Sequence, residues 1–425
     1  MTTTIIKTYN DLWYAVQSAS DGDIFQLSPG EYEQLNFANN HFSPNGILIT
    51  SEFEDNQASA HGIKLDTCSG FQFTKLKVTL NGPYDVGCMV DMSSDVLFSE
   101  LTIFSTTGVN EGQGVRINDT TGATVTLCDI GHVGSGVLNS GCTNITISKN
   151  NLHDLQIDGI LTGGSRQVTV AENQICDLYP QAGDHPDAIQ FAADSRTGAA
   201  GDQVIVRDND IKRGAGEILQ GIFIENTNNM TISGNAMAGT MDNGISLITV
   251  DTALIDPNFV QGFTDCRSII AVRGSTSVTV TNNTANNISN GPEENPGFVA
   301  DGNTPIGYAE VGDYSDMDAW RKEHPAGGAP APTTQACVAC MYYLAVDSSG
   351  GLCRRFPPDH SQPWGSWPAV KTTDWCGEFL AGTSPGGPLG RGEEHEPKHH
   401  RPRNHHRGEG QKGDHRPGHR AVRQR

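Results

Sequence analysis

The sequence lacks any run of about 18 consecutive apolar residues, so no segment is expected to span a membrane as a helix. Its first residues, MTTTIIKTYNDLWYAV, lack the basic start, the apolar stretch and the small-residue cleavage site of a secretory signal. Export by that route is therefore not expected. Charged residues are also few, at 18% of the 425 positions.

Basic residues are the scarcer of the two charged classes, with 28 Lys and Arg against 49 Asp and Glu. Residues 391–425 carry ten Lys or Arg and five Asp or Glu, which leaves residues 1–390 with a net charge of −26. An acidic body of this kind repels phosphate backbones and argues against a nucleic acid as the ligand. Residues 386–425 are rich in His and Arg and almost free of apolar side chains, which predicts a disordered tail.

Against this sparse background, a short motif recurs, in which β-branched or apolar residues alternate with polar ones and an Asn follows. Its clearest copies are NITISKN (144–150), QVTVAEN (167–173), QVIVRDN (203–209), NMTISGN (229–235) and SVTVTNN (277–283). Between them lies a second strand signal, in which Gly or Ala follows the first residue: QGVRI (113), SGVLN (135), DGILT (158), DAIQF (187), QGIFI (220) and NGISL (243). Period-2 alternation with a repeat of about 22 residues predicts a parallel β-solenoid. The aligned Asn side chains are expected to hydrogen-bond from turn to turn.

The N-terminal segment carries a resemblance to a known fold family. A short amphipathic stretch, LWYAVQSA, precedes DGDIFQLSPGEY (21–32), and the Asn-ended repeats follow. This arrangement resembles the right-handed parallel β-helix proteins, which include alginate-lyase-like and chondroitinase-like enzymes, mannuronan epimerases, polygalacturonases and phage tailspike depolymerases. The resemblance implies an all-β fold, with an N-terminal capping segment at 1–20, a right-handed parallel β-helix at 21–315 and a linker at 316–334.

The strongest candidate for catalysis is a cluster of one histidine and three aspartates. Pro186 favours an extended backbone at His185, so that His185 and Asp187 project to the same side. Asp184 or Asp187 can then orient the imidazole as a base. Asp158 occupies the position of Asp187 in the preceding turn, which predicts that the two carboxyls lie about 5 Å apart. One of the two is then expected to have a raised pKa.

Further residues on the outward strand face are candidates for substrate binding. Gln190 offers a hydrogen bond, Phe223 offers a stacking face, and Glu225 continues the same strand. Arg116 is a candidate cation for an acidic sugar. The other cations considered for that role are Arg196, Lys212 and Arg213.

Two chemistries stay open for the predicted site. A polysaccharide hydrolase would use Asp158, Asp184 and Asp187 as acid and base. A uronate lyase or C5-epimerase would use His185 to remove a proton, with Ca²⁺ or an arginine neutralising the sugar carboxylate. The aspartates resemble those of polygalacturonases, but the Gly-His-Gly and Arg-Ile-Lys elements of that family are absent, as is the DPH signature of the epimerases.

The C-terminal region has its own pattern of cysteines, at Cys337, Cys340, Cys353 and Cys376. A CxxC pair followed by two further cysteines predicts a small Cys₄ metal module at 335–385, with zinc favoured, an iron–sulfur cluster as the alternative and disulfides third. The six other cysteines are scattered and are expected to be reduced and buried.

The sequence as a whole predicts a protein that binds a polysaccharide and cleaves it. The missing signal, the β-helix and the small module together resemble phage tailspikes or tail fibres, which implies a homotrimer located in the virion, or in the cytoplasm before lysis. The alternatives are a non-catalytic adhesin or structural solenoid, and a bacterial lyase or epimerase secreted by a signal-independent route.

Overall fold

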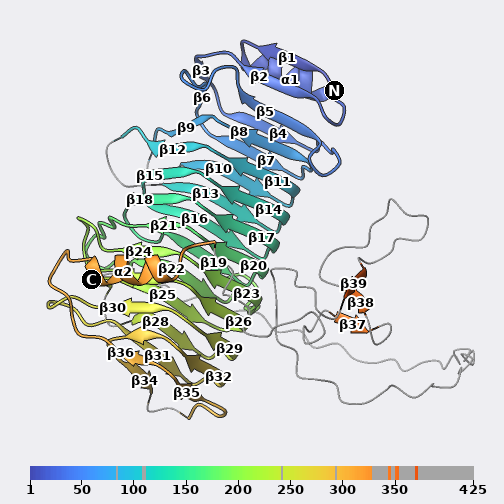
Figure 1. Cartoon of the computed structure of the whole chain (residues 1–425). Helices are drawn as coiled ribbons and strands as arrows, with labels where there is room; N and C mark the ends of the chain where they lie inside the picture. Colours follow the sequence, from blue (N-terminus) through green and yellow to red (C-terminus); the bar gives the residue numbers. More distant parts are fainter. Residues whose placement is uncertain are drawn as a thin grey trace, which may run out of the picture. The chain divides into compact units, whose positions relative to one another are not determined.

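The computed structural model describes residues 1–327 except 83–84, 108–111, 241–242 and 292–293, and the backbone of 343–345, 350–353 and 369–371. The chain divides into two units, Met1–Ala331 and Pro332–Arg425. The first unit is a parallel β-helix, in which three sheets of short strands follow the axis of the coil (Figure 1). The fold class predicted from the repeats is confirmed.

Each complete turn of the coil contributes one strand to each of the three sheets, named here sheets C, A and B in the order in which the chain passes through them. In the described residues, sheet C consists of β4 (Leu35–Ala38), β7 (Ile63–Asp66), β10 (Val86–Asp91), β13 (Gln113–Asn118), β16 (Ser135–Ser140), β19 (Ile160–Gly163), β22 (Asp187–Ala192), β25 (Gln220–Glu225), β28 (Asn243–Ile248), β31 (Ile269–Arg273) and β34 (Ile288–Asn290).

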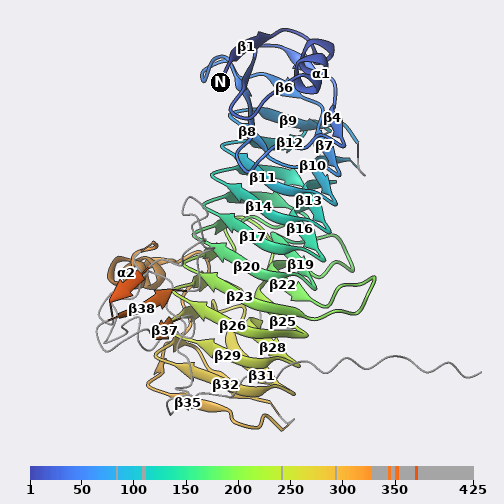
Figure 2. The ribbon, with the colours of Figure 1, turned by 90° about the vertical axis from the view of Figure 1, so that its right-hand side faces the viewer.

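Sheet A consists of β1 (Thr3–Ile6), β2 (Ile24–Leu27), β5 (Ile47–Ser51), β8 (Phe71–Thr74), β11 (Ser94–Ser99), β14 (Thr121–Thr126), β17 (Thr143–Ser148), β20 (Arg166–Ala171), β23 (Gly201–Arg207), β26 (Thr227–Ser233), β29 (Asp251–Ile255), β32 (Thr276–Thr281) and β35 (Val299–Asp301). Sheet B consists of β3 (Glu31–Tyr32), β6 (Ser59–Ala60), β9 (Lys77–Leu80), β12 (Thr102–Ser105), β15 (Asp129–Val133), β18 (Asn151–Leu155), β21 (Gln174–Ile175), β24 (Asp210–Lys212), β27 (Ala236–Ala238), β30 (Phe259–Gln261), β33 (Thr284–Ala285) and β36 (Thr304–Pro305). Figure 2 shows sheets A and C side by side along the coil.

The alternation of the repeat motif sets which side chains fill the coil. In β17, Ile145 and Ile147 are almost fully buried, whereas Thr146 between them is partly exposed. Ile145 pairs in register with Val168 of β20, so aliphatic side chains stack along the interior from one turn to the next. One continuous apolar core results, because every turn repeats the same inward positions.

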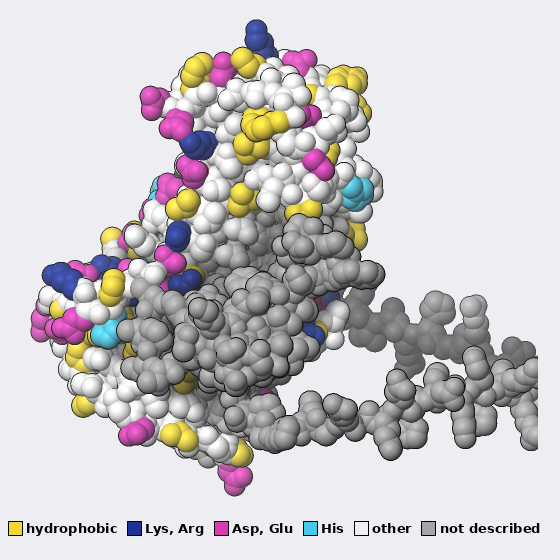
Figure 3. Space-filling view, turned by 45° about the vertical axis from the view of Figure 1, so that its right-hand side comes forward, with side chains coloured by type: hydrophobic (Ala, Val, Ile, Leu, Met, Phe, Trp, Pro, Cys, Tyr) yellow, Lys and Arg dark blue, Asp and Glu magenta, His cyan; other side chains and the backbone are white. Residues whose placement is uncertain are grey.

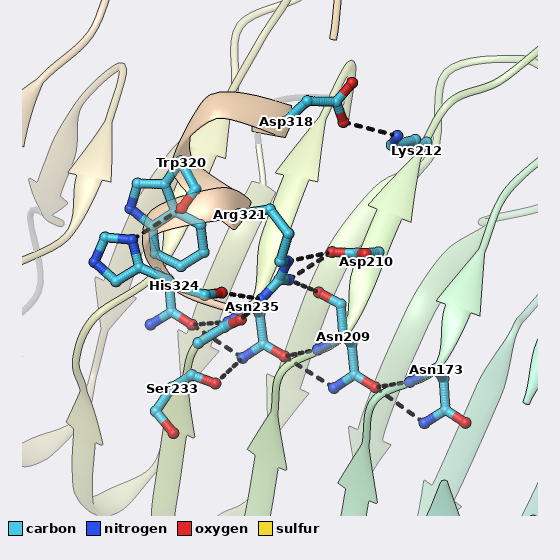
Figure 4. Close-up of polar contacts among 12 residues, drawn as sticks. Asn173, Asn209, Asp210, Lys212, Ser233, Asn235, Asp318, Trp320, Arg321 and His324 are labelled. Carbon is cyan, nitrogen blue, oxygen red and sulfur yellow. Dashed lines mark hydrogen bonds and ion pairs between the residues drawn. The ribbon is translucent and has the colours of Figure 1, made fainter. Parts of the chain in front are cut away.

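A ladder of buried asparagines runs along the corner between sheets A and B. The amide Nδ2 of Asn173 donates to Oδ1 of Asn209 at 2.9 Å, and Nδ2 of Asn209 donates to Oδ1 of Asn235 at 2.8 Å (Figure 4). The same contact continues through Asn258, which belongs to an extra turn in the 48-residue gap between motif copies. The predicted asparagine ladder is confirmed.

Replacing a ladder residue is expected to destabilise the coil. Asn209→Ala removes the acceptor that the buried backbone N–H and the side-chain amide of Asn173 share. Each such group costs about 1–3 kcal/mol, so we expect the free energy of unfolding in urea to fall by roughly 3 kcal/mol. The control is Asn151→Ala, which removes an exposed amide, and equal losses for the two variants would contradict this role of the ladder.

Two helices pack against the β-helix. Helix α1 (Tyr9–Gln17) lies at the N-terminal end of the coil, within the predicted capping segment, and buries Leu12 and Val16 in the core (Figure 1). Helix α2 (Ser315–Glu323) packs beside β27 and β30 and buries Met317 and Trp320. In the described residues, neither helix combines the length and the apolar character that a membrane crossing requires.

The position of α2 corrects the linker predicted at 316–334. The Arg321 guanidinium donates to Oδ1 of Asp210 and to the carbonyls of Asn209 and Gly234, while Lys212 pairs with Asp318 at 3.2 Å (Figure 4). The first part of this segment is therefore a docked helix. Apolar periodicity does not predict this helix, because its sequence is highly charged and buries only two apolar residues.

The second unit contains a small antiparallel sheet of β37 (Tyr343–Ala345), β38 (Gly350–Cys353) and β39 (Ala369–Lys371). Of the predicted metal ligands, Cys337, Cys340 and Cys376 lie outside the described residues, and only the backbone of Cys353 is described. The predicted tail at 386–425 also lies outside them. Of the six scattered cysteines, which are free thiols, four are buried as predicted (Cys68, Cys88, Cys128 and Cys142), whereas Cys176 and Cys266 are partly exposed.

Candidate functional site

Polar residues stand in register at the start of four consecutive strands of sheet C. This polar row consists of Asp158, Asp187, Gln220 and Asn243, and the pairing of Asp187 with Gln220 fixes its register. The residue after each is Gly or Ala because the turns approach closely there. A Cβ added at Gly159 would lie 2.4 Å from the carbonyl oxygen of Ala188.

The predicted imidazole–carboxylate pair is present. Nδ1 of His185 lies 3.1 Å from Oδ2 of Asp187, and the edge of the His185 ring meets Phe223 at a centroid distance of 5.7 Å. Asp187 is completely buried, whereas 63% of the His185 side chain is exposed. His185 is therefore the member of the pair that faces solvent, and Asp187 lies beneath it.

Asp158 adjoins this pair from the preceding turn. Its Oδ1 accepts a hydrogen bond from the backbone N–H of Asp187 at 3.2 Å, and the residue is only 6% exposed. The predicted stacking of the two aspartates is thus present. The insertion between the two turns loops out without displacing the strands, since Ile160 still pairs with Ile189.

Burial sets the electrostatics of both carboxyls. Loss of hydration raises the pKa of Asp187 to about 8, helped by the negative charges of Asp158 and Glu225. Burial also raises the pKa of Asp158 to about 6, against the opposing effect of its hydrogen bond from Asp187. Burial therefore shifts both carboxyls towards their protonated forms, which limits the charge that the site must bury.

Asp184 makes structural contacts, and its predicted catalytic role stays a prediction. Its Oδ2 accepts hydrogen bonds from Nε2 of Gln156 at 2.9 Å and from the backbone N–H of Gln181 at 2.8 Å. These contacts fasten the loop that precedes β22 to the loop of the turn before it. The structure places Asp184 as an anchor of the loop that carries His185.

The predicted binding residues divide into two groups. Gln190 and Phe223 pair in register on the outer face of sheet C, and Glu225 lies further along the Phe223 strand. Arg116 lies on β13, three strands away from β22, or about 14 Å at the usual strand spacing. The first group adjoins the His–Asp pair, whereas Arg116 does not.

Among the four predicted cations, Arg116 alone has no acidic partner within the described residues. Its Nη2 lies 3.2 Å from Sδ of Met89, and its buried Nε has no hydrogen-bond partner there. Arg196 pairs with Asp119 and Asp194, Lys212 pairs with Asp318, and Arg213 pairs with Asp265. These three basic side chains are committed to structural contacts. On the face that Figure 3 shows, acidic side chains are spread along the coil, and basic ones stand singly among them.

Buried polar atoms without partners concentrate on sheet C. Of eight such side-chain atoms in the described residues, six belong to its strands: Gln113 Oε1, Arg116 Nε, Asn139 Oδ1, Asp187 Oδ1, Asn243 Oδ1 and Ser246 Oγ. Unpaired buried groups are costly and are rare away from functional sites. This distribution singles out sheet C independently of the His–Asp pair.

Gln220 and Asn243 are site residues that the sequence analysis did not select. Nε2 of Gln220 approaches both ring nitrogens of His185, and Nδ2 of Asn243 donates to Oε1 of Gln220 at 2.5 Å. Their signal is visible in the repeats, because QGIFI and NGISL align with DGILT and DAIQF. The column that contains both aspartates also contains both amides.

A metal site is not evident in the described part of the coil. No group of three or more His, Cys, Asp or Glu side chains there is arranged to hold an ion. The calcium suggested for the β-helix, and the zinc or iron–sulfur cluster suggested for the cysteines, stay predictions.

One edge of sheet C is held by a strap, the loop at residues 193–200. Arg196 forms two hydrogen bonds with Asp119, at 2.6 and 2.9 Å, and one with Asp194 at 2.9 Å. Its guanidinium holds the pKa of Asp194 well below its usual range. Gly141 lies beneath these groups, where an added Cβ would be 2.7 Å from Nη2 of Arg196. The strap leaves β22 directly, so it fixes one border of the site.

Removing this clamp is expected to loosen the strap without unfolding the coil. In Arg196→Met, hydrogen exchange of the amides at 196–198 should become roughly tenfold faster, since a charged hydrogen bond contributes about 1.5 kcal/mol. The control is Arg166→Met, which removes an exposed ion pair with Asp202. Unchanged exchange in Arg196→Met would show that the clamp does not hold the strap.

Comparison with known proteins supports the fold. A family model described as "Right handed beta helix region" matches residues 32–175. This match covers about a third of the chain and agrees with the predicted right-handed parallel β-helix, whose three parallel sheets continue beyond the matched residues. No curated protein matches the chain.

Solved structures with a similar fold share little sequence with the chain. An alginate lyase from Paenibacillus sp. str. FPU-7 has 16% identity and a TM-score of 0.47 over 71% of this chain and 99% of the other. The Dettilon tailspike protein has 14% identity and a TM-score of 0.46 over 69% of this chain and 64% of the other. The A-module of a mannuronan C-5 epimerase from Azotobacter vinelandii has 14% identity and a TM-score of 0.47 over 70% and 95%.

Proposed function

We propose that the protein binds a polysaccharide along the outer face of sheet C and hydrolyses it beside His185. The observation that carries the proposal is the exposed imidazole of His185 over the buried carboxyl of Asp187, with Asp158 in contact from the preceding turn. Base, orienting group and acid are thus assembled at one point of a long regular face.

In this reaction, His185 takes a proton from water as the water oxygen attacks the anomeric carbon. Asp158, whose pKa is raised to about 6, gives its proton to the glycosidic oxygen as that bond breaks. Asp187 holds the imidazole, and Phe223 and Gln190 lie beside it on the outer face. Flat sugar rings can stack on Phe223, while Gln190 can hydrogen-bond their hydroxyls.

The charges around the pair favour hydrolysis over elimination from a uronate. Elimination requires a cation that neutralises the sugar carboxylate where the proton is removed. In the described residues, Asp187 contacts His185, and Asp158, Asp184 and Glu225 lie close enough to raise the pKa of one or the other buried aspartate, whereas Arg116 lies about 14 Å away along the sheet. A neutral sugar at the cleavage point fits this acidic surrounding better than a uronate.

The direct test incubates the full-length protein with neutral and acidic polysaccharides, including bacterial capsules, and follows reducing ends together with absorbance near 232 nm. New reducing ends without absorbance support hydrolysis. A rise in both signals means elimination and overturns the proposed reaction. Binding without either signal means that the protein is an adhesin, and the absence of both binding and cleavage removes the polysaccharide proposal altogether.

The tailspike assignment and the homotrimer are proposals of the same kind. A parallel β-helix that acts on bacterial surface glycans would suit a phage tail. Analytical ultracentrifugation of the full chain tests the trimer, and a monomer at micromolar concentration would argue against it.

A further inference from the structure

The hydrogen bonds of the polar row run in one direction. Nδ2 of Asn243 donates to Oε1 of Gln220, Nε2 of Gln220 donates to His185, and Nδ1 of His185 lies 3.1 Å from Oδ2 of Asp187. Gln220 is 1% exposed and Asp187 is fully buried, so water cannot easily replace these partners. The side-chain NH₂ groups of Asn243 and Gln220 thus each face an acceptor, on Gln220 and His185 respectively.

The orientation of the Gln220 amide follows from its neighbour. If Gln220 alone were reversed, its NH₂ would face the NH₂ of Asn243, which places two donors together. If both amides were reversed, the NH₂ of Asn243 would occupy the buried position where its Oδ1 now has no partner. An unpaired buried N–H group is rarer than an under-satisfied carbonyl, so the present arrangement is favoured.

This orientation constrains the proton on His185. Gln220 presents its NH₂ closer to Nε2 than to Nδ1 of the imidazole, and a donor there requires a lone pair on Nε2. With the lone pair on Nε2, the ring proton of a neutral imidazole belongs on Nδ1, where Oδ2 of Asp187 at 3.1 Å can accept it.

We propose that Gln220, oriented by Asn243, is a positioning residue that holds His185 as the neutral tautomer with its proton on Nδ1 and a basic lone pair on Nε2. The inference rests on the proposed role of His185 as the base: the lone pair that accepts from Gln220 in the protein without substrate is the one that would take the proton of the attacking water. It adds Gln220 and Asn243 to the site. Their proposed role differs from packing, because packing does not depend on whether the NH₂ or the oxygen of the Gln220 amide faces the ring.

The test uses the full-length protein with ¹⁵N-labelled histidine, and ring-nitrogen signals are assigned to His185 by their loss in His185→Gln. In the unsubstituted protein at neutral pH, we expect Nδ1 to give the chemical shift of a protonated nitrogen and Nε2 that of an unprotonated one. A proton on Nε2 in this protein would overturn the proposal.

Two isosteric substitutions are expected to reverse the direction of the hydrogen bonds between Asn243, Gln220 and His185. Gln220→Glu places an acceptor beside Nε2, and the Nε2 signal should move to the range of a protonated nitrogen. Asn243→Asp should do the same at a distance, because Gln220 then turns its NH₂ toward the introduced carboxylate and its oxygen toward the ring. The matched control, Gln174→Glu on the exposed surface of sheet B, should leave the His185 signals unchanged.

A third variant separates positioning from a general structural effect. In the Gln220→Met background, Asn243→Asp should no longer alter the His185 signals, because the amide that transmits its effect is gone. If Asn243→Asp acts equally with and without Gln220, or has no effect in the protein that retains Gln220, the proposal is wrong. Circular dichroism of each variant establishes that the coil is folded before its spectrum is compared.

These spectra require no substrate, so the two proposals can fail separately. A protein with the expected tautomer that cleaves no glycan would contradict the proposed function alone. A protein that cleaves glycan by way of His185 but has its proton on Nε2 would contradict the assignment of Gln220 alone.

Discussion

Replacing His185 with alanine is expected to lower the rate of polysaccharide hydrolysis by a factor on the order of 10²–10⁴, the usual contribution of a general base. The side chain is mainly exposed and makes its polar contacts with Asp187 and Gln220, so its loss should change the overall fold little. Affinity for the glycan should persist, since Phe223 and Gln190 are retained. The measurement is kcat and KM on whichever polysaccharide releases reducing ends.

The matched control for this substitution is His132→Ala. His132 is 55% exposed, lies on β15 of sheet B and faces Asp154 at 4.0 Å, so it resembles His185 in exposure and in having a carboxylate neighbour. Its replacement should leave the rate within about twofold of the original, as expected for a surface substitution. Equal loss of activity in both variants, or full activity in His185→Ala, would remove His185 from the mechanism.

The second large effect is expected from Asp187→Asn, which should stabilise the protein increasingly as pH rises. The folded protein raises the pKa of Asp187 from an unfolded value of 3.8 to about 8. Between these values the folded state retains a proton that the unfolded state releases, so stability falls as pH increases from about 4 to 8. Asparagine has no proton to lose, and its amide oxygen can still accept from Nδ1 of His185.

Unfolding by urea at a series of pH values measures this effect. We take the difference in the free energy of unfolding between the two proteins at pH 4 as the reference. At pH 7 this difference should have shifted in favour of the variant by up to about 4 kcal/mol. Asp251→Asn, which replaces an exposed carboxylate of sheet A, is the control. Parallel pH profiles for Asp187→Asn and the original protein would show that the buried carboxyl costs no stability.

The coil could be predicted from the sequence because its determinants are local and repeated. Each turn needs inward aliphatic residues in alternation and an asparagine at one corner, and NITISKN supplies both within seven residues. Helix α2 could not be found in this way. Its stability depends on Trp320 and Arg321 meeting a particular part of the coil, and nothing in its own composition reveals that partner.

The candidate site could be predicted in part. The alignment of DGILT with DAIQF placed Asp158 beside Asp187, and Pro186 placed His185 on the same side as Asp187. The complete burial of Asp187 could not be foreseen, because it depends on how the preceding loop folds over the strand. The loop contact of Asp184 could not be foreseen either, since its partner Gln156 comes from another loop.

The asparagine ladder also determines what sheet C is free to do. The ladder occupies the corner between sheets A and B, which in a three-sided coil is the edge opposite sheet C. The ladder sets the spacing of the turns at this edge, and the side chains of sheet C are free to vary. Residues such as Asp158, Asp187 and Gln220 are therefore aligned by contacts that they do not themselves have to make. Because the asparagine ladder stabilises the stacking of the turns, sheet C can carry buried carboxyls and unpaired polar atoms that would otherwise destabilise it.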